Sequence, residues 1–184
     1  LSLEEGTLQP VIRTAAEGDR VWSRRAKVPD PATHPLCVMR LNTNTDPIRQ
    51  KPYPIPHKYV EAVRQEVEGL LKANLIEPGT GDWCSPVLCI IKKDSTADSI
   101  KLKMAVDFRR VNAATQVDAG SLGDQSDILE MFNGKPYTSL CDAAGGYYQF
   151  AIAPEDRPKT GFILPTACGG TIFQWKVAPY GIAN

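Results

Sequence analysis

The sequence predicts an α+β fold, because hairpin-like strand patterns are mixed with a small number of helical patterns. The clearest helix is marked by apolar residues that recur at helical spacing; they are Val60, Val63, Val67, Leu70 and Leu71. The clearest strand spans residues 101–108, where apolar and charged side chains alternate. One face of it carries Leu102, Met104, Val106 and Phe108, and the other carries Lys101, Lys103 and Asp107.

The remaining elements are shorter. The apolar run at 87–91 is consistent with a buried strand, and the polar residues 94–99 link it to the alternating strand, so the two are expected to form a hairpin. A short helix is expected at 126–132, and further strands at 137–142, 148–152 and 171–177. In the last strand, one face is expected to carry Phe173, Trp175 and Val177 and the other Gln174 and Lys176.

The first part of the chain has a different character. Residues 1–45 show weak periodicity and are interpreted as an extension with little core of its own. Prolines then crowd the next segment, at positions 47, 52, 54 and 56. Alternate prolines favour an extended backbone without internal hydrogen bonds. This segment is therefore expected to run along a surface as a semi-rigid strap.

Composition places the chain in a broad class. Its 184 residues suffice for one good-sized domain or two small ones, and 42% hydrophobic and 23% charged residues are ordinary for a soluble globular protein. No apolar run approaches the ~20 residues that span a bilayer. Residue 1 is Leu, which suggests a start inside a longer product. The chain is expected to be intracellular, with the compartment unknown.

The distribution of charges and the cysteines narrow the class of protein further. The net charge is zero, yet residues 92–110 hold six Lys or Arg against three Asp, and residues 111–134 hold four acidic residues and no basic ones. A uniformly basic nucleic-acid coat is thereby disfavoured, whereas a local basic surface is not. The five cysteines include no C-x-x-C. Reduced, mostly buried thiols are the preferred interpretation, and a zinc site is disfavoured.

Several short sequence segments resemble one protein family, and they occur in the family's order and at its spacing. They are Asp46–Pro56, the helix end Leu70–Pro78, Trp83–Val87, Lys92–Asp94, Val106–Asn112, Asp142 with Gly146–Gln149, Ala153–Asp156, Pro158–Thr160, and Pro179–Gly181 with Asn184. Together they resemble the reverse transcriptases of gypsy-like LTR retrotransposons and their retroviral relatives. The resemblance covers residues 46–184. It implies a right-hand polymerase fold, with fingers at 46–135 and part of the palm at 136–184.

The resemblance also implies a metal-dependent reaction. Polymerases of this family use two magnesium ions held by three palm carboxylates, and Asp142 matches the first of these. The alternative is an Asp that caps the following turn. The other two carboxylates come from a Tyr-x-Asp-Asp hairpin, and the chain contains no Asp-Asp pair. The chain alone is therefore expected neither to hold magnesium nor to polymerise.

Other roles are implied for the substrates, which would be deoxynucleotides and an RNA or DNA template-primer. Tyr147 matches the position that excludes a ribose 2′ hydroxyl, and a core tyrosine is the alternative. Lys92 and Lys103 match the residues that clasp the triphosphate, with a solvated charged face as the alternative. Tyr180 and Gly181 match a loop near the nucleotide. The further basic residues expected to contact nucleic acid are Lys93, Lys101, Arg109 and Arg110.

Two functions stay open. The chain is either the fingers and partial palm of an active polymerase or a non-catalytic module, derived from such an enzyme, that binds or scaffolds within a larger protein or ribonucleoprotein assembly. The sequence departs from the family at 94–100, 120–125 and 143–145. These departures are consistent with ordinary divergence and also with an element that has lost its original selection. Other protein chains are expected to cover an open palm edge, where Phe173 and Trp175 would otherwise lose cover.

Overall fold

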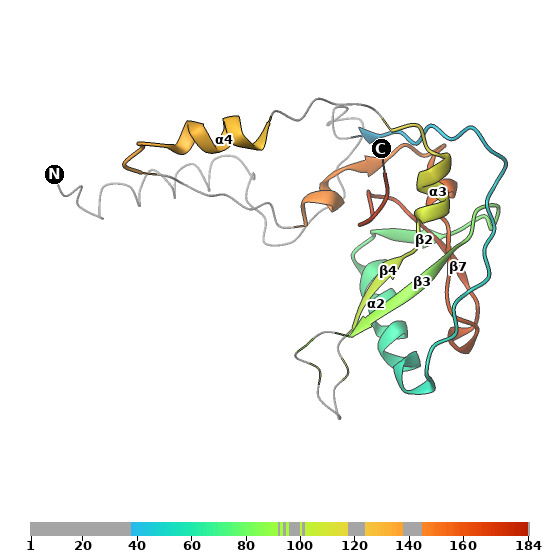
Figure 1. Ribbon diagram of the computed structural model, residues 1–184. Coiled ribbons are helices and arrows are strands. Elements are labelled where there is room, and N and C mark those ends of the chain that lie inside the picture. The colour runs from blue at the N-terminus through green and yellow to red at the C-terminus, as the bar shows by residue number, and fades with distance from the viewer. Residues whose placement is uncertain are drawn as a thin grey trace.

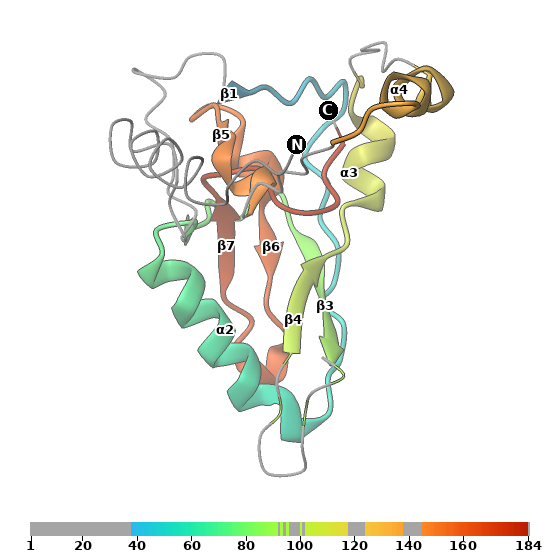
Figure 2. The same cartoon turned by 90° about the vertical axis from the view of Figure 1, so that its left-hand side faces the viewer.

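The computed structural model describes residues 38–91, 93, 95, 100, 102–117, 124–137 and 145–183. Its centre is a five-stranded sheet in the order β2 (Ile76–Pro78), β7 (Ile172–Trp175), β6 (Phe162–Ile163), β3 (Ser85–Ile91) and β4 (Leu102–Val106). The pair β3 and β6 is parallel, and the other neighbours are antiparallel. Helix α2 (Val60–Lys72) lies across one face of this sheet (Figures 1 and 2). The α+β prediction is confirmed.

The core lies between α2 and the sheet. Helix α2 buries Val60, Val63 and Val67, as its spacing predicts, whereas Leu71 at the end of the helix is 38% exposed. Strand β4 and the residue pair after it bury the predicted apolar face, which consists of Leu102, Met104, Val106 and Phe108. The helix ends near Asn74, whose φ of 58° is left-handed. Asparagine tolerates this conformation and is common just past a helix end.

The predicted hairpin of β3 and β4 is confirmed, with Val87 opposite Val106 and Ile90 opposite Lys103. The expectation of a buried strand at 87–91 is wrong for three of its five residues, because Leu88, Ile90 and Ile91 are 42%, 53% and 47% exposed. Side chains alternate along a strand, and α2 covers one face of the sheet. Leu88 and Ile90 lie on the other face.

The end of β4 corrects another expectation. The sequence pattern predicts Asp107 on the charged, outward face, but this residue is 5% exposed. Strand β4 ends at Val106 and α3 (Arg109–Ala114) begins two residues beyond Asp107. The strand alternation therefore stops before Asp107, and its carboxylate is held by Tyr53 and Arg109 instead.

The segment before α2 forms an extended strap. Strand β1 (Val38–Met39) pairs in parallel with β5 (Ala151–Ile152), and Leu41 is fully buried beside it. Single bridges then join Thr43 to Thr115 and Arg49 to Cys84. Residues 50–56 lack regular structure and lead into the short helix η2 (His57–Tyr59). The strap follows the outside of the sheet (Figure 1), in agreement with its proline spacing.

The predicted strand at 148–152 is wrong in its first half. Residues Gly146–Gln149 form the 3₁₀ helix η3, and β5 is confined to Ala151–Ile152. Gly145, at a φ of 60°, turns the chain, and its carbonyl accepts a hydrogen bond from the amide of Tyr148 at 2.8 Å. A left-handed residue of this kind suits glycine. The strand prediction therefore failed because a glycine turn precedes the tyrosines.

The other short elements agree better. Helix α4 (Gln125–Phe132) confirms the predicted short helix, and the Asp124 side chain caps it by accepting from the amide of Ser126. Strand β7 confirms the core of the prediction at 171–177. Two further 3₁₀ helices are η4 (Arg157–Thr160) and η5 (Thr166–Cys168). The predicted strand at 137–142 falls largely on residues 138–144, which lie outside the described residues.

The apolar side chains of β7 are less exposed than the sequence predicts for an open palm edge. Trp175 is 4% exposed and stacks on Tyr148, with ring centroids 5.8 Å apart. Phe173 is partly buried and contacts Phe162. Within the described part of the chain, exposed apolar side chains lie instead on β3 and on α4, and on α4 Leu129 and Met131 are 70% and 72% exposed.

Two further observations concern cysteines and membranes. Cys84 and Cys168 are buried free thiols, Cys89 is a half-buried one, and burial raises the pKa of all three. None of the helices that the structure describes has the length and apolar character to cross a membrane.

Candidate nucleotide and nucleic-acid site

Three tyrosines and a lysine from distant parts of the chain meet beside the β3–β4 hairpin. The ring of Tyr180 has its centroid 5.1 Å from that of Tyr147 and 5.3 Å from that of Tyr148. The ammonium Nζ of Lys103 lies 4.3 Å from the centroid of the Tyr180 ring, in a cation–π contact. We call these four residues the Tyr180 cluster.

The backbone places each member. Tyr147 and Tyr148 belong to η3, directly after the left-handed Gly145. Tyr180 follows β7 on a loop that is anchored where the amide of Ala178 donates to the carbonyl of Phe150 at 2.8 Å. Lys103 lies on the outward face of β4, because its neighbours Leu102 and Met104 point into the core. The outward face of the hairpin thus meets the loop after β7.

The members differ in exposure. Tyr147 is 52% exposed and Tyr180 39% exposed, so both rings present surface to a ligand. Tyr148 is half-buried between Tyr180 and Trp175. Burial raises the pKa of Tyr148 to about 12, with smaller contributions from Tyr180 and Glu66. Tyr148 therefore forms the half-buried base of the cluster, and Tyr147 and Tyr180 form its solvent-exposed surface.

Asn112 holds the loop that carries Tyr180. Its side-chain amide donates to the carbonyl of Gly181 at 2.8 Å, and its carbonyl accepts from the amide of Ala183 at 2.9 Å. Gly181 itself has a φ of 86°, a conformation that favours glycine. Asn112 lies on α3, so this helix fixes the position of the loop.

A second polar group lies at the start of α3. Arg109 donates from Nε and Nη2 to the two oxygens of Asp107, at 2.8 and 2.6 Å, and Tyr53 donates to the same carboxylate at 2.9 Å. The hydrogen bond from Arg109 holds the pKa of Asp107 well below its usual range, and Asp107 raises the pKa of Arg109 in turn. The Arg109 side chain is nevertheless 83% exposed.

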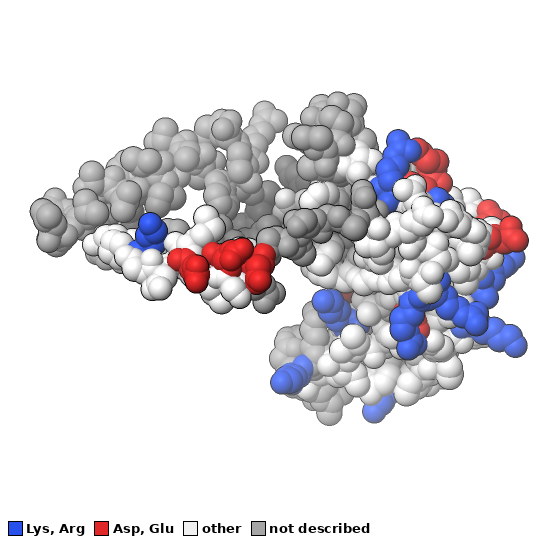
Figure 3. Space-filling view, turned by 45° about the horizontal axis from the view of Figure 1, so that its top comes forward, with Lys and Arg blue, Asp and Glu red and all other residues white. Residues whose placement is uncertain are grey.

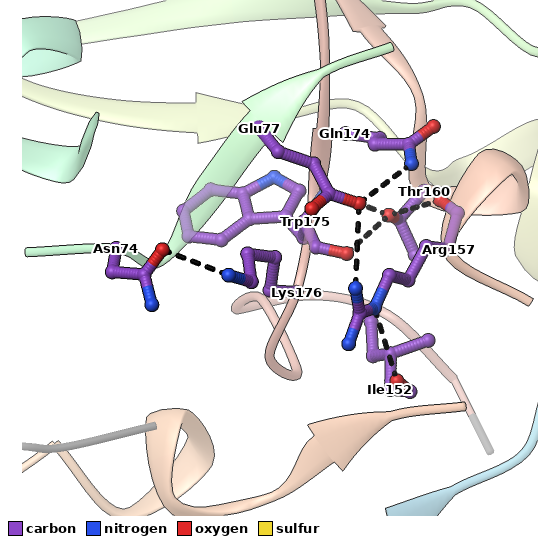
Figure 4. A network of polar contacts seen from close by, with 8 residues as sticks. All are labelled: Asn74, Glu77, Ile152, Arg157, Thr160, Gln174, Trp175 and Lys176. Carbon is purple, nitrogen blue, oxygen red and sulfur yellow. Dashed lines mark hydrogen bonds and ion pairs between the residues drawn. The ribbon is translucent and has the colours of Figure 1, made fainter. Parts of the chain in front are cut away.

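A network of polar contacts joins β2, β7 and η4 (Figure 4). Glu77 on β2 accepts from Gln174 on β7 at 2.9 Å and from Arg157 on η4 at 3.5 Å. Thr160 accepts from the amide of Trp175 at 2.9 Å and donates to the carbonyl of Arg157 at 2.7 Å. These contacts fix η4 against β7, so the network stabilises the strand whose Trp175 stacks on Tyr148 of the Tyr180 cluster.

The strap is fastened to the same helix. The amide of Leu41 donates to Asp156 at 3.0 Å, and Lys159 donates to Asp156 at 2.7 Å and to the carbonyl of Leu41. Both the amide and the carbonyl of one buried strap residue are therefore satisfied by side chains from the η4 region. Since buried backbone groups are costly to leave unpaired, this contact fixes the strap.

The structure brings together Lys103, Tyr147, Tyr180 and Gly181, which sequence reasoning selected for nucleotide contact. Of the residues selected for nucleic-acid contact, Lys93, Arg109 and Arg110 are exposed. Asp142, Lys92 and Lys101 lie outside the described residues. Sequence reasoning did not assign a role to Asn112, although the residue closes one of the family-like strings.

Charge is distributed unevenly over the surface. Figure 3 shows acidic side chains gathered on the arm formed by α4, whereas most of the visible Lys and Arg side chains lie over the sheet and its connections. Within the ranges that the structure describes, no group of three His, Cys, Asp or Glu side chains could hold a metal ion. The described part of the site is thus cationic and aromatic, a combination suited to phosphates and bases.

The chain is similar in sequence to the polyproteins of retroelements and plant viruses. It is 29% identical over 145 residues to the retrovirus-related Pol polyprotein from transposon opus of Drosophila melanogaster, a match that covers 78% of this chain and 14% of the relative. It is 30% identical over 138 residues to the Pol polyprotein from transposon 412 of the same fly, covering 74% and 11%. The enzymatic polyprotein of figwort mosaic virus is 28% identical over 135 residues, covering 73% and 20%. No protein-family profile matches the chain.

Solved structures share the fold. The protease–reverse transcriptase of prototype foamy virus superimposes with a TM-score of 0.70 in a mutant form and 0.68 in the native form, at 21% identity. The mutant comparison covers all of this chain and 23% of the viral one. A foamy viral protease–reverse transcriptase in complex with double-stranded DNA gives a TM-score of 0.58 over 76% of this chain.

The fold and these relatives define the chain as reverse-transcriptase-like. More particularly, its sequence is similar to parts of the retrovirus-related Pol polyproteins of two retrotransposons and of the enzymatic polyprotein of a plant virus. It spans about a fifth or less of the length of these three curated relatives.

Proposed function

We propose that the chain forms the nucleotide-binding side of a retroelement reverse transcriptase, with residues 46–135 as fingers and 136–184 as the first part of the palm. The Tyr180 cluster carries the proposal, because Tyr180 contacts both Lys103 of the β3–β4 hairpin and Tyr147 of η3, two residues that the resemblance to the family selects for nucleotide contact. Residues 1–45 are proposed as an N-terminal extension with little core of its own, whose last residues, 38–45, begin the strap.

The proposed roles follow from the chemistry of each group. Lys103 supplies an ammonium that binds the triphosphate as a compact positive charge. Tyr147 presents its exposed ring to the sugar, where a 2′ hydroxyl would overlap it. Tyr180 and Gly181, on the loop after β7, line the nucleotide site. Lys92 is proposed as the second cation of the triphosphate site.

Nucleic acid is proposed to bind beside this site. Lys93, Arg109 and Arg110 are exposed near the β3–β4 hairpin, and phosphate contacts by such residues supply most sequence-independent affinity. Lys101 is proposed to join them. The related foamy viral protein has been solved in complex with double-stranded DNA, which supports a nucleic-acid partner.

Catalysis is proposed to need groups beyond this chain. Asp142 is proposed as one carboxylate ligand of magnesium, which would activate the primer hydroxyl and stabilise charge on the leaving oxygens. One carboxylate does not hold two hard cations, which take several oxygen ligands each. The chain by itself is therefore proposed to bind substrates without polymerising them.

A second function is favoured by one observation. Helix α4 exposes Leu129 and Met131 at 70% and 72%. An exposed apolar group of this kind marks a contact surface for another protein. The alternative is thus a non-catalytic module that scaffolds a larger protein or ribonucleoprotein assembly.

Nucleotide binding and incorporation separate these proposals. We expect the chain to bind a deoxynucleoside triphosphate in equilibrium dialysis, and Lys103→Gln to weaken this about fivefold, equivalent to about 1 kcal/mol. Lys58→Gln is a matched control, because Lys58 also lies over a tyrosine ring, that of Tyr59, at 5.1 Å. Equal affinities in the wild type, Lys103→Gln and Lys58→Gln would contradict the proposal that Lys103 belongs to a nucleotide site.

Incorporation on a primed homopolymer template, with magnesium or manganese, tests catalysis. We expect the wild-type chain to incorporate no more nucleotide than Asp142→Asn. Template-dependent synthesis above that control would show that this chain carries a complete active site.

A further inference from the structure

One side-chain amide connects α3 to the loop after β7. Both polar atoms of the Asn112 amide are used, since Nδ2 donates to the carbonyl of Gly181 and Oδ1 accepts from the amide of Ala183. The two contacts lie on either side of residue 182, directly after Tyr180. Asn112 therefore determines where the loop leaves Tyr180.

The ring of Tyr180 connects this loop to the hairpin. Tyr147 and Tyr148 contact the ring at centroid distances of 5.1 and 5.3 Å, and the ammonium of Lys103 lies 4.3 Å from its centroid. A displacement of the loop would move the ring relative to η3 and to β4 together. Such a displacement would therefore also change the contact between the ring and the Lys103 ammonium.

The contact with the ring leaves the ammonium able to bind an anion. A lysine ammonium has three N–H donors on a flexible stem of four carbons. The ring face attracts the ammonium from one side, so donors on the other side stay available to phosphate oxygens. Holding the stem in advance also reduces the entropy that binding would otherwise cost.

We propose that Asn112 is a positioning residue for Lys103, acting through Tyr180, and that it thereby raises the affinity of the site for a polyphosphate. The inference rests on the proposed function, because the triphosphate of a nucleotide is the ligand that this function names. A cation–π contact at an exposed site is worth about 0.5–1 kcal/mol. Removing it corresponds to about a two- to fivefold weaker polyphosphate affinity.

The position of the ammonium is measured by NMR on the whole 184-residue chain, without any ligand. The ring current of Tyr180 moves the Lys103 ε-methylene resonance upfield of that of Lys72, whose side chain is 80% exposed. We expect Asn112→Ala to return the Lys103 resonance toward that of Lys72. Tyr180→Leu removes the ring and defines the complete effect. A Lys103 resonance that stays upfield in Asn112→Ala would overturn the inference.

The effect on affinity is measured with inorganic triphosphate by calorimetry in a double-mutant cycle. We expect Asn112→Ala to weaken binding about two- to fivefold when Lys103 is present, and to have no further effect in the Lys103→Gln background. General loosening of the fold would weaken binding equally in both backgrounds, which would also overturn the inference.

A second variant and the ligand-free NMR measurement distinguish failure of this inference from failure of the proposed function. If Asn112→Ala does not fold, Asn112→Asp replaces it, because this variant keeps the acceptor for Ala183 and loses the donor to Gly181. A wild-type chain that binds neither triphosphate nor nucleotide would contradict the proposed function. The NMR comparison would still decide whether Asn112 positions Lys103.

Discussion

The carboxylate of Asp107 and the guanidinium of Arg109 form a two-pronged contact, with N–O distances of 2.8 and 2.6 Å, at the junction of β4 and α3. Arg109 is exposed while Asp107 is buried, so the pair links the surface to the interior. Tyr53 of the strap donates to the same carboxylate at 2.9 Å. One acidic side chain therefore joins the strap, the strand and the helix that carries Asn112.

This geometry predicts an acid-sensitive contribution to stability. The pKa of Asp107 is lower in the folded chain than the value of about 3.9 of an unfolded one. Its stabilising effect is therefore complete above about pH 4 and disappears as the pH falls further. We expect Asp107→Asn to lower the free energy of unfolding at neutral pH by about 1.5–3 kcal/mol.

Denaturant titrations at a series of pH values check this. The difference between wild type and Asp107→Asn should shrink as the pH falls below about 4. Asp46→Asn, at an exposed position of the strap, serves as the control. A difference that stays constant with pH would show that the Asp107 carboxylate is not what stabilises the junction.

The close packing at Gly161 predicts a large effect from a small change. A Cβ atom there would lie 2.2 Å from the backbone carbonyl oxygen of Trp83, which cannot move without disturbing β3. We expect Gly161→Ala to destabilise the fold by about 1–3 kcal/mol or more. Gly69→Ala is the matched control: Gly69 lies within α2 with nothing within 4 Å of the added atom. Thermal melts should show that variant stabilised by about 0.5–1 kcal/mol.

Nucleic-acid binding should be weak and governed by salt. We expect sequence-independent affinity on the order of micromolar or weaker. Charge reversal of Lys101 and Lys103 should lower the slope of log affinity against log salt by about 1 for each lysine that binds a phosphate in the wild type. Lys58 and Lys72, at the two ends of the η2–α2 helical segment, provide a control pair for reversal. Filter binding over a salt series would contradict the proposed surface if both pairs gave the same slope.

The steric role of Tyr147 is testable in a longer protein that polymerises. Tyr147→Val should raise the use of ribonucleotides relative to deoxyribonucleotides by at least ~10-fold in kcat/KM, about 1.4 kcal/mol. Single-nucleotide incorporation with both sugars measures this ratio.

Tyr148 provides the comparison, for a reason that the structure revises. Residues 147 and 148 lie in a 3₁₀ helix, not in a strand, and both rings contact Tyr180. Tyr148 is the half-buried one and stacks on Trp175. Tyr148→Val should therefore lower the melting temperature more than the sugar discrimination. A larger change in discrimination for Tyr148→Val would show that the roles are exchanged.

The exposed apolar side chains of α4 predict self-association. Leu129 and Met131 are 70% and 72% exposed, and such groups seek apolar contacts. The double change Leu129→Glu and Met131→Glu should reduce aggregation in analytical ultracentrifugation and leave the melting temperature nearly unchanged. A sharply melting, monodisperse wild-type monomer would contradict this expectation.

The sequence by itself determined the elements with a strong period. Val60, Val63 and Val67 predicted α2, and the alternation from Leu102 to Phe108 predicted β4, because burial on one face imposes a repeat that can be read locally. The ordered family-like strings, which do not depend on such a repeat, predicted the right-hand polymerase fold and the relatives. Tyr147 and Tyr180 were identified within these strings, and Lys103 from its match to a family position between two of them.

Only the tertiary structure decided how those residues meet. Asp107 sits where the strand pattern ends, so its burial depends on Tyr53 and Arg109, which no local pattern reveals. The contacts of Tyr180 with Lys103 and of Asn112 with Gly181 join segments that lie far apart in sequence. Contacts of this kind arise from the packing of whole elements, and the position of a charged side chain over a ring is fixed by that packing.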